Sequence, residues 1–419
     1  MLKPLSLLFS SIIRDGNITF VDASGEAHRF GNGAGQPITV EIADRRLEWH
    51  LVLDPEMAAG EGYMSGRLRV TQGSVYDFVA LMMRNMAERP LPRYAQRVAR
   101  LRNRVRRLAQ YNPARRAKRN VRHHYDIDPR IYDLFLDPDR QYSCAYFAEP
   151  AMSLAEAQAA KKRHIAAKLR LAPGLHVLDI GSGWGGLALY LARASGADVT
   201  GITLSEEQIR IARERAAAAA LERAPRFELS DYRAVEGTFD RVVSVGMFEH
   251  VGLPHYETFF ATVARLMAPG GTALIHTIGR TDTPVATNPF IARYIFPGGY
   301  IPALSEIMSA VEASGLIVTD VEVLRLHYAE TLLAWRRRFL ANRQAAVAIA
   351  GEEFCRMWEF YLAGSEAAFR FQNFVVFQVQ LARRVDTLPI TRDYMTAAER
   401  ALPVGLVQPE RPQVIAAGQ

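Results

Sequence analysis

The 419-residue chain has only two cysteines, Cys144 and Cys355. Two thiols cannot form the disulfide framework of a small secreted protein or a closed structural zinc site, so the composition favours a reducing compartment. No run of roughly 18 apolar residues occurs, which argues against a membrane-spanning helix. The short uncharged stretch from Leu5 to Ile13 is not followed by a small-residue cleavage site, so we expect no secretory leader.

Acidic residues are absent from 89–122, a segment that holds thirteen Lys and Arg. The chain carries a formal charge of +7, yet outside this segment the remaining 38 of its 51 basic residues stand against 44 acidic ones. Inside it, Val98, Leu101, Val105 and Leu108 recur at helical spacing, which predicts an amphipathic cationic helix. This helix is either a solvated linker or an arm for an anionic partner. Anionic lipid and nucleic acid would both attract it.

A length of 419 residues predicts two or three domains, and residues 1–88 have the pattern of a small α+β domain. Apolar residues repeat at helical spacing over 2–13, and we expect this helix to dock on its own domain rather than on a membrane surface. Alternating apolar and polar residues over 38–42 and 47–53 predict two half-buried strands. A helix is expected from about Val75 onward.

From residue 123 to about 395, predicted strands and helices alternate. The expected strands are 176–180, 198–204, 227–229, 241–245, 272–277, 316–324 and 374–381. The expected helices are 184–194, 205–221 and 255–267. This order predicts an α/β domain with a Rossmann-like, mostly parallel sheet and helices on both faces. Residues 396–419 are expected to form a loosely ordered tail.

A glycine-rich turn follows the first of these strands, from Gly181 to Gly186. Glycines let the backbone approach a ligand closely, and the start of a helix offers unpaired N–H groups. The turn is therefore a candidate cofactor site, and a tight strand–helix turn without ligand is the alternative. The next strand ends in Thr203-Leu204-Ser205 and lacks the acid that normally holds the ribose of a dinucleotide.

Seven separated segments carry a more specific signal. They are His124-Tyr125-Asp126, Gln141 to Phe147, Val177 to Gly186, Ser244 to Gly252, His276 to Gly279, Tyr294 to Gly299 and His327 to Leu332. In this order they resemble the cyclopropane-fatty-acyl-phospholipid synthases and the related mycolic acid cyclopropane synthases. The resemblance is close over about 118–395 and weaker over the N-terminal part, where it rests on 60–68.

The resemblance implies a seven-stranded methyltransferase fold that uses S-adenosylmethionine. By motif position it places ten residues around this cofactor: Tyr142 and Ser143 at the methionine end, Gly181, Ser182 and Gly183 beneath, Thr203, Leu204 and Gln208 at the ribose, and Asp231 and Tyr232 at the adenine. Ordinary aromatic packing is the alternative for the two tyrosines. Serine replaces the cysteine that the family often has between the two glycines, and we expect no effect, because backbone N–H groups do the binding.

The reaction implied by the resemblance transfers a methylene group to the cis double bond of an unsaturated acyl chain in a membrane phospholipid. A carbocation forms on the way, so the pocket must be dry, and a base must remove a proton from the new methyl group. The family uses bound bicarbonate as this base. The residues at the matching positions are Cys144, Glu249, His276, Ile278 (through its backbone) and Tyr328. The rings of Tyr125, Phe147 and Phe248 are expected to face the cation.

Each of these residues has a structural alternative. Cys144 could be a small buried apolar residue, His276 a core histidine and Glu249 the cap of a turn. A Cys-His-Glu trio also suggests a metal, but it does not match closed zinc spacing, so we expect no metal. Ser365 replaces a late cysteine found in many relatives, and Cys355 is out of register, so we expect no covalent cysteine mechanism there.

Two other activities remain open. Methyl branching of an acyl chain differs from ring formation only in where the proton is lost, which motifs do not reveal. A nucleic-acid methyltransferase or binding protein would suit the basic segment, but Gly246-Met247-Phe248-Glu249 stands where base-methylating enzymes usually carry Asn/Asp-Pro-Pro-aromatic. We therefore expect no nucleic-acid partner.

The expected partners are an unsaturated phospholipid and, through the basic linker at 89–122, an anionic membrane surface. A peripheral, cytoplasmic location on the inner face of the membrane follows from these expectations. The resemblance also suggests a homodimer, in which the N-terminal domain helps at the membrane.

Overall fold

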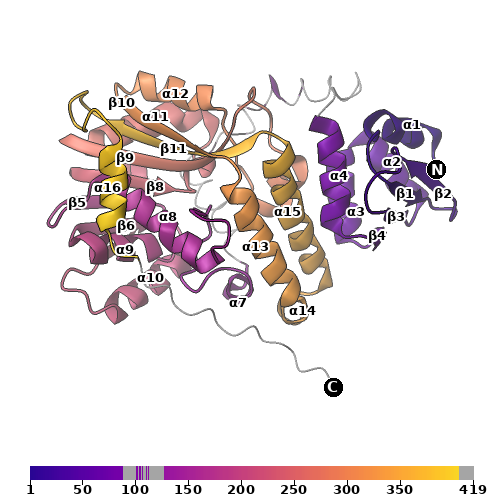
Figure 1. Ribbon diagram of the computed structural model, residues 1–419, viewed down its shortest axis with the longest axis horizontal. Helices are drawn as coiled ribbons and strands as arrows, with labels where there is room; N and C mark the ends of the chain where they lie inside the picture. The colour runs from indigo at the N-terminus through magenta and orange to yellow at the C-terminus, as the bar shows by residue number, and fades with distance from the viewer. Residues whose placement is uncertain are drawn as a thin grey trace.

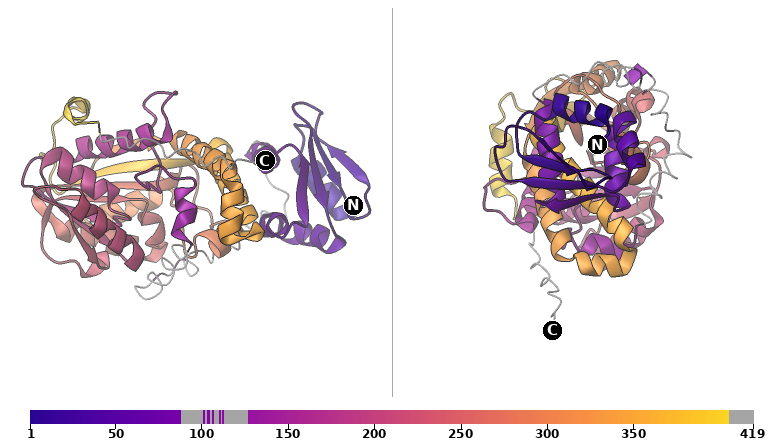
Figure 2. Two further views of the ribbon diagram at one scale, coloured as in Figure 1. Left: turned by 90° about the horizontal axis from the view of Figure 1, so that it is seen from below. Right: turned by 90° about the vertical axis from the view of Figure 1, so that its right-hand side faces the viewer.

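The computed structural model describes residues 1–87 and 127–404, and residues 101, 103, 104, 106, 110 and 112 between them. The cationic helix predicted within 89–122, the segment His124-Tyr125-Asp126 and residues 405–419 lie largely or wholly outside the described residues. A small N-terminal domain and a larger sheet domain stand at opposite ends of the molecule, with helices α13 (His327–Ala341) and α15 (Glu352–Phe371) between them (Figures 1 and 2).

The N-terminal domain is a four-stranded sheet, ordered β2-β1-β3-β4, packed against helices. Its strands are β1 (Ile18–Val21), β2 (Ala27–Phe30), β3 (Ile38–Ile42) and β4 (Leu68–Gln72). Its helices are α1 (Lys3–Ile12), α2 (Arg45–Leu53), α3 (Pro55–Met64) and α4 (Val75–Ala87). The predicted α1, β3 and α4 are confirmed, and the buried side chains of Leu5, Leu8 and Phe9 dock α1 on its own domain.

The second strand predicted in this domain is wrong, because that segment is helix α2. Asp44 caps the helix by accepting a hydrogen bond from Leu47 N at 2.9 Å. Leu47 and Leu51, four residues apart, are buried, whereas Trp49 and Leu53 are 47% and 72% exposed. Half of the alternating apolar residues thus face solvent. In a strand all four would share one face, whereas in a helix only residues four apart, such as Leu47 and Leu51, do so.

The larger domain is built on a seven-stranded sheet ordered β10-β11-β9-β8-β5-β6-β7. The strands are β5 (His176–Ile180), β6 (Asp198–Thr203), β7 (Arg226–Leu229), β8 (Phe239–Val245), β9 (Met267–Arg280), β10 (Ile317–Leu324) and β11 (Phe374–Ala382). Strands β5 to β9 pair in parallel, and β11 is antiparallel to both β9 and β10. The predicted α/β, Rossmann-like seven-stranded fold with a small N-terminal α+β domain is confirmed.

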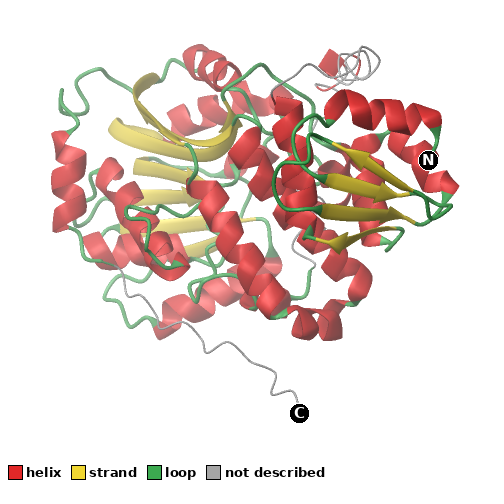
Figure 3. Cartoon of the chain, turned by 45° about the vertical axis from the view of Figure 1, so that its right-hand side comes forward, coloured by secondary structure: helices red, strands yellow, loops and turns green. Residues whose placement is uncertain are grey.

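Helices cover both faces of this sheet (Figure 3). Helices α8 (Leu154–Leu169), α9 (Gly186–Ser195) and α10 (Glu206–Ala218) share a core with one face, and α11 (Tyr256–Leu266) and α12 (Leu304–Ala313) with the other. Short turns named η1 (Tyr232–Ala234), η2 (Phe248–His250), η3 (Leu253–His255) and η4 (Ile291–Ile295) connect these elements. Adjacent residues of β8 enter different cores, Val243 the first and Val242 the second, as pleating requires.

Helix α15 joins the two domains. Ala363 and Ala367 on α15 belong to the core of the N-terminal domain, whereas Trp358 belongs to a second core. That second core includes residues of α7 (Pro129–Asp133), α13 and α14 (Arg343–Ala350). Glu366 of α15 is 1% exposed and pairs with Arg336 of α13 at 2.9 Å. The N-terminal domain therefore packs on the helices of the larger domain mainly through α15, and Tyr294 adds a hydrogen bond to Glu61 of α3 at 2.8 Å.

The described chain ends with helix α16 (Asp393–Ala401), so the expectation of a loose tail is wrong for residues 396–401. Met395 is buried, and Glu399 bonds His164 Nδ1 on α8 at 3.0 Å. This ion pair and the buried methionine hold the helix on the domain. Among the described residues, none of the helices is long and apolar enough to cross a bilayer.

Candidate active site

Strand β5 ends in the glycine turn, where the neighbouring strands are β8 on one side and β6 on the other. Such a point, at the carboxyl ends of parallel strands, is where open α/β sheets bind ligands. The N–H groups of Gly181 and Ser182 both donate to Ile202 O at 2.9 Å, which ties the turn to β6. Gly183 has a φ of +54°, and a Cβ there would meet nothing within 4 Å, so its backbone borders open space.

A single pocket at this turn is lined by all ten residues that the resemblance placed around the cofactor. They are Tyr142, Ser143, Gly181, Ser182, Gly183, Thr203, Leu204, Gln208, Asp231 and Tyr232. Asp179, His250 and Asn112 also line it, and the sequence reasoning did not place them there. Asn112 belongs to the linker, is buried, and donates to His250 O at 2.7 Å. The end of the linker thus contributes to the pocket.

Asp179 gives this pocket a buried carboxyl group. It is 1% exposed, and its Oδ2 has no hydrogen-bond partner. Burial raises the pKa of Asp179 to about 7, against the influence of Lys161, which lowers it. A buried carboxylate needs a cationic or hydrogen-bond-donating partner to remain charged. The pocket therefore fits a ligand with positive charge, as the ammonium and sulfonium groups of S-adenosylmethionine provide.

The polar residues at the ends of β6 and β7 are arranged as a network. Thr203 Oγ1 donates to Gln208 Oε1 at 2.8 Å, and Ser205 Oγ accepts from Gln208 N at 3.3 Å as the cap of α10. After β7, Asp231 holds Arg233 through two bonds of 2.6 and 2.8 Å. These contacts fix the side chains that face the pocket, with no acid at the end of β6.

None of the five residues assigned to proton removal lines this pocket. Cys144 and Tyr328 share the aromatic core formed by α7, α13 and α15, and Ile278 packs against it. Cys144 Sγ contacts the carbonyl oxygen of Ala145 at 3.2 Å, and burial raises the pKa of its thiol. A neutral, buried thiol is a weak hydrogen-bond donor and no nucleophile. The structure places these three residues in or against one core, and Cys144 directly follows Ser143 of the pocket in the sequence.

Glu249 and Ile278 are in direct contact. Glu249 Oε1 accepts a hydrogen bond from Ile278 N at 2.7 Å, while its Oε2 is buried without a partner. Burial raises the pKa of Glu249 to about 7, although the bond from Ile278 acts to lower it. The Ile278 N–H, which the resemblance directs at bicarbonate, is thus engaged by Glu249 in this structure. A carboxyl group with this pKa is partly protonated at neutral pH and can donate a hydrogen bond.

His276 lies two residues before Ile278, on the same face of β9, and is 2% exposed. Burial lowers the pKa of His276 well below its usual value, and the nearby cation of Lys161 acts in the same direction. Gln378 on the adjacent β11 places its Nε2 3.1 Å from His276 Nδ1. An amide nitrogen only donates, so in this arrangement Nδ1 accepts and Nε2 carries the proton of the neutral ring.

Two of the three aromatic rings expected to face a cation fall within the described residues, and Tyr125 does not. Phe147 packs against the core that holds Cys144 and Tyr328, and its role toward a cation stays a prediction. Phe248 instead is fully buried in the core on the other side of the sheet, with its ring 4.4 Å from that of Tyr256. Its surroundings explain it as a core residue.

Three buried polar residues beside these sites were missed as site residues. Asp179 stands in the motif before the glycine turn, Lys161 on α8, and Gln378 on β11. Lys161 and Gln378 have no exposed surface. A charged or amide side chain inside a run of apolar residues is the signal that could have found Asp179 and Gln378, since buried polar groups require specific partners.

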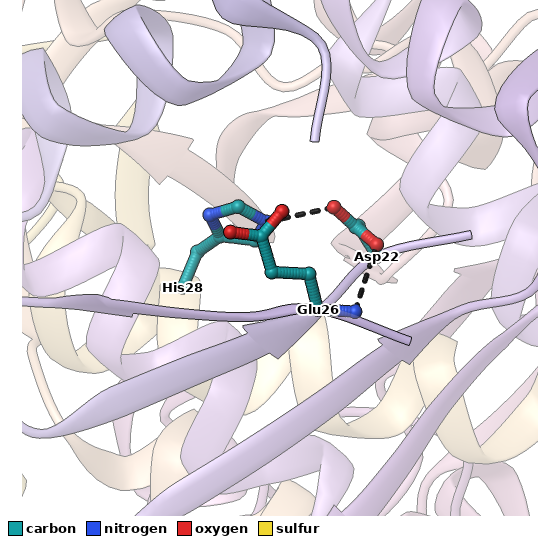
Figure 4. A group of neighbouring side chains, drawn as sticks. All are labelled: Asp22, Glu26 and His28. Carbon is teal, nitrogen blue, oxygen red and sulfur yellow. Dashed lines mark hydrogen bonds and ion pairs between the residues drawn. The ribbon is translucent and has the colours of Figure 1, made fainter. Parts of the chain in front are cut away.

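A cluster of Asp22, Glu26 and His28 in the N-terminal domain also brings together possible metal ligands (Figure 4). Asp22 Oδ1 accepts bonds from Ser24 N at 2.8 Å and Glu26 N at 3.1 Å, which close the β1–β2 turn. Its Oδ2 bonds His28 Nε2 at 2.7 Å and also contacts the amine of Met1. Turn formation therefore accounts for this arrangement, and it carries no argument for a metal.

A parallel sheet with one reversed strand, a glycine turn at its switch point and a pocket suited to a cationic ligand define an S-adenosylmethionine-dependent methyltransferase. A solved mycolic acid cyclopropane synthase in complex with SAH and CTAB is 34% identical, with a TM-score of 0.61 over 65% of this chain and 99% of that one. Residues 112–379 match the profile of the mycolic acid cyclopropane synthetase family, and the chain belongs to this family.

Relatives known from their sequences agree with this placement. The cyclopropane-fatty-acyl-phospholipid synthase of Escherichia coli strain K12 is 36% identical over 355 residues, which cover 85% of this chain and 90% of that enzyme. A tuberculostearic acid methyltransferase of Mycobacterium tuberculosis is 42% identical over 280 residues, covering 64% of this chain and 65% of the relative. The resemblance noted from the motifs is thereby confirmed.

Proposed function

We propose that this enzyme transfers a methylene group from S-adenosylmethionine to the cis double bond of an unsaturated acyl chain in a membrane phospholipid, giving a cyclopropane ring. The observation that carries the proposal is that ten of the predicted residues line one open pocket. Four of the others, Cys144, Glu249, His276 and Tyr328, are buried and do not line it. The similarity to the Escherichia coli synthase over most of both chains supports this choice of substrate.

In this proposal the pocket residues hold the cofactor, which supplies an electrophilic methyl group on a sulfonium. The backbone at Gly181 to Gly183 lies beneath it, and Thr203, Leu204 and Gln208 bind on the ribose side. Tyr142 and Ser143 bind at the methionine end, and Asp231 and Tyr232 border the adenine. The cationic donor provides the positive charge that the buried Asp179 requires.

For proton removal, Cys144, Glu249, His276, the Ile278 backbone and Tyr328 are proposed to hold a bicarbonate ion. The Nε2–H of neutral His276 is a donor that fits an oxyanion in a buried site, and the orphaned Glu249 Oε2 becomes a second donor when it carries the proton. A bicarbonate would also receive the Ile278 N–H if Glu249, once protonated, released it. The apolar and aromatic residues around Cys144 and Tyr328 exclude water, which would otherwise quench the carbocation.

The substrate is a membrane lipid, so the enzyme is proposed to visit the inner, cytoplasmic face of the membrane as a peripheral protein. The arginines of the basic linker are expected to draw it to anionic headgroups. A second contact is available on α2, where Arg45, Arg46, Trp49 and Leu53 are exposed on one face. Apolar and basic side chains together are typical of surfaces that lie on a bilayer. A homodimer remains part of the proposal from the resemblance.

Methyl branching of the acyl chain is the second candidate. The similarity to a tuberculostearic acid methyltransferase favours methyl branching, because that relative is named as a methyltransferase of a fatty acid and not as a cyclopropane synthase. Expression in a host that lacks cyclopropane fatty acids, followed by mass spectrometry of fatty acid methyl esters, separates the two. Ring formation adds one carbon and two hydrogens and leaves no double bond. A methyl branch formed by the same transfer loses its proton from a chain carbon and keeps a double bond at the same mass, so the fragmentation of the esters distinguishes the two. A saturated branch, two hydrogens heavier, needs a reductant from the host.

A further inference from the structure

Lys161 of α8 is a buried cation that contacts two residues of the cofactor pocket. It has no exposed surface, and its Nζ donates to Gln141 Oε1 and to Ser143 Oγ, both at 2.8 Å. Gln141 and Ser143 both line the pocket. One lysine therefore fixes two side chains of the segment that is proposed to meet the methionine end of the cofactor.

The same helix holds the backbone of this segment. Gln158, three residues before Lys161 and on the same face of α8, donates to Ser143 O at 2.9 Å and Gln141 O at 3.3 Å. Asp137 Oδ1 accepts from Gln141 N at 2.8 Å and completes the turn. Because backbone and side chains are all held from α8 and the turn, the segment is pre-organised before a ligand binds.

Two neutral acceptors do not account for the burial of a charge, because an isolated buried ammonium is costly. Nearby carboxyl groups supply the compensation: Asp137, Asp139 and Asp179 all interact electrostatically with Lys161. Burial still lowers the pKa of Lys161 to about 8, although Asp137 acts to raise it. Of the three carboxyl groups, only Asp179 lines the pocket.

We propose that Lys161 is a positioning residue for the methyl donor: its ammonium group fixes the side chains of Gln141 and Ser143 in the segment that meets the methionine end of the cofactor. This inference rests on the proposed cofactor site. Lys168, two turns later on α8, shows what a purely structural lysine looks like here. It is 1% exposed and pairs with Glu322, and neither residue lines the pocket.

The test compares Lys161→Met with Lys168→Met, since each removes one buried charge from the same helix. Binding of S-adenosylmethionine and of S-adenosylhomocysteine is measured by calorimetry at about pH 7. We expect Lys161→Met to bind both roughly tenfold or more weakly at about pH 7, the loss typical of a charged hydrogen-bond partner. Lys168→Met is expected to bind as the wild type does.

A conservative variant separates positioning from structural damage. The amide of Lys161→Gln keeps a donor for Gln141 or Ser143, so this variant should bind both ligands more tightly than Lys161→Met does. Unchanged affinity in Lys161→Met, or a loss of the same size in Lys168→Met, overturns the proposal.

If Lys161→Met does not fold, as judged by circular dichroism, Lys161→Gln takes its place, because an amide keeps a donor for Gln141 or Ser143 while removing the charge. Weaker binding than in the wild type and in Lys168→Met is required of it, and the absence of that loss overturns the proposal. A wild-type chain that binds neither ligand would instead reject the proposed cofactor site itself. The two failures are thus distinguishable.

Discussion

Glu249 Oε1 accepts a hydrogen bond from the Ile278 N–H at 2.7 Å, which joins the turn after β8 to strand β9. The other carboxyl oxygen of Glu249 is buried without a partner. Glu249 thus accepts the hydrogen bond of the backbone N–H that we expect to face an anion. Its second carboxyl oxygen is left without a hydrogen bond and can still bind a ligand. This relationship makes Glu249 the residue on which the account of proton removal depends most.

Replacing Glu249 with Gln, or His276 with Ala, should lower the rate of ring formation by roughly 100-fold or more, the usual contribution of a general acid–base group. Neither residue lines the cofactor pocket, so the affinity for S-adenosylmethionine should change little. Turnover is measured by gas chromatography of the product and affinity by calorimetry. Near-normal turnover in both variants would refute the assigned roles.

Gln378→Leu should reduce kcat without changing the KM for S-adenosylmethionine, because Gln378 Nε2 orients the ring of His276 through Nδ1. We expect a fall of roughly tenfold, in the range seen when a group that orients a functional histidine is removed. Gln380→Leu is the matched control on the same face of β11, since Gln380 bonds Lys168 O and Tyr394. Equal effects of the two substitutions would indicate that only the stability of β11 matters.

The affinity of the wild type for S-adenosylmethionine should fall as the pH decreases through about 7. Asp179 has its pKa raised to about 7 by burial, so acid converts it to the neutral form, which holds a cation poorly. A bound cation favours the ionised carboxylate, so binding below about pH 7 should also release a proton. Calorimetry in buffers of different ionisation enthalpy measures that proton. In Asp179→Asn the release should vanish, and its persistence would point to another group.

Replacing Arg97, Arg100, Arg104 and Arg107 with Gln should weaken binding to vesicles that contain anionic lipid, by at least tenfold. The expectation rests on an attraction of about 1 kcal/mol for each basic residue near an anionic surface. Salt screens this attraction, so the difference between the variant and the wild type should disappear at high salt. Co-sedimentation at low ionic strength is the measurement.

A charge-matched control uses four exposed arginines of the larger domain, Arg193, Arg210, Arg226 and Arg384. Their replacement by Gln should leave vesicle binding near the wild-type level. If both sets weaken binding equally, net charge and not the linker draws the enzyme to lipid. Unchanged sedimentation of the linker variant would remove the linker from the membrane proposal.

The packing of α16 should weaken as the pH rises above neutral. Burial of His164 acts to lower its pKa, but hydrogen bonds to Glu322 and Glu399 outweigh burial and raise it. A group with a raised folded pKa stabilises fully below its unfolded value of about 6.5 and loses that contribution as the pH passes the folded value. The amide hydrogen exchange rate of α16 should therefore increase with pH more steeply than the intrinsic exchange rate of unprotected amides does. Glu399→Gln should remove most of this dependence.

The fold of the larger domain could be predicted because its buried parallel strands have runs of apolar residues in the sequence. The glycine turn that begins at Gly181 marks the end of the first of these strands. The cofactor residues followed from motif order, and all ten line one pocket. Helix α2 was missed because Trp49 and Leu53 are apolar but exposed, and no single-residue pattern says which apolar side chains find a core. The role proposed for Lys161 was hidden for a related reason: its partners lie 18 and 20 residues away, and only packing brings them together.

The most direct test of the central claim supplies the purified enzyme with phospholipid vesicles and S-adenosylmethionine deuterated in its methyl group. The transferred methyl group loses one deuteron before the ring closes, so the product acyl chain should carry two deuteriums on a cyclopropane carbon. A product with three deuteriums on a methyl branch would contradict ring formation and establish methyl branching. No labelled acyl chain at all, with cofactor bound normally, would contradict the assignment of the substrate.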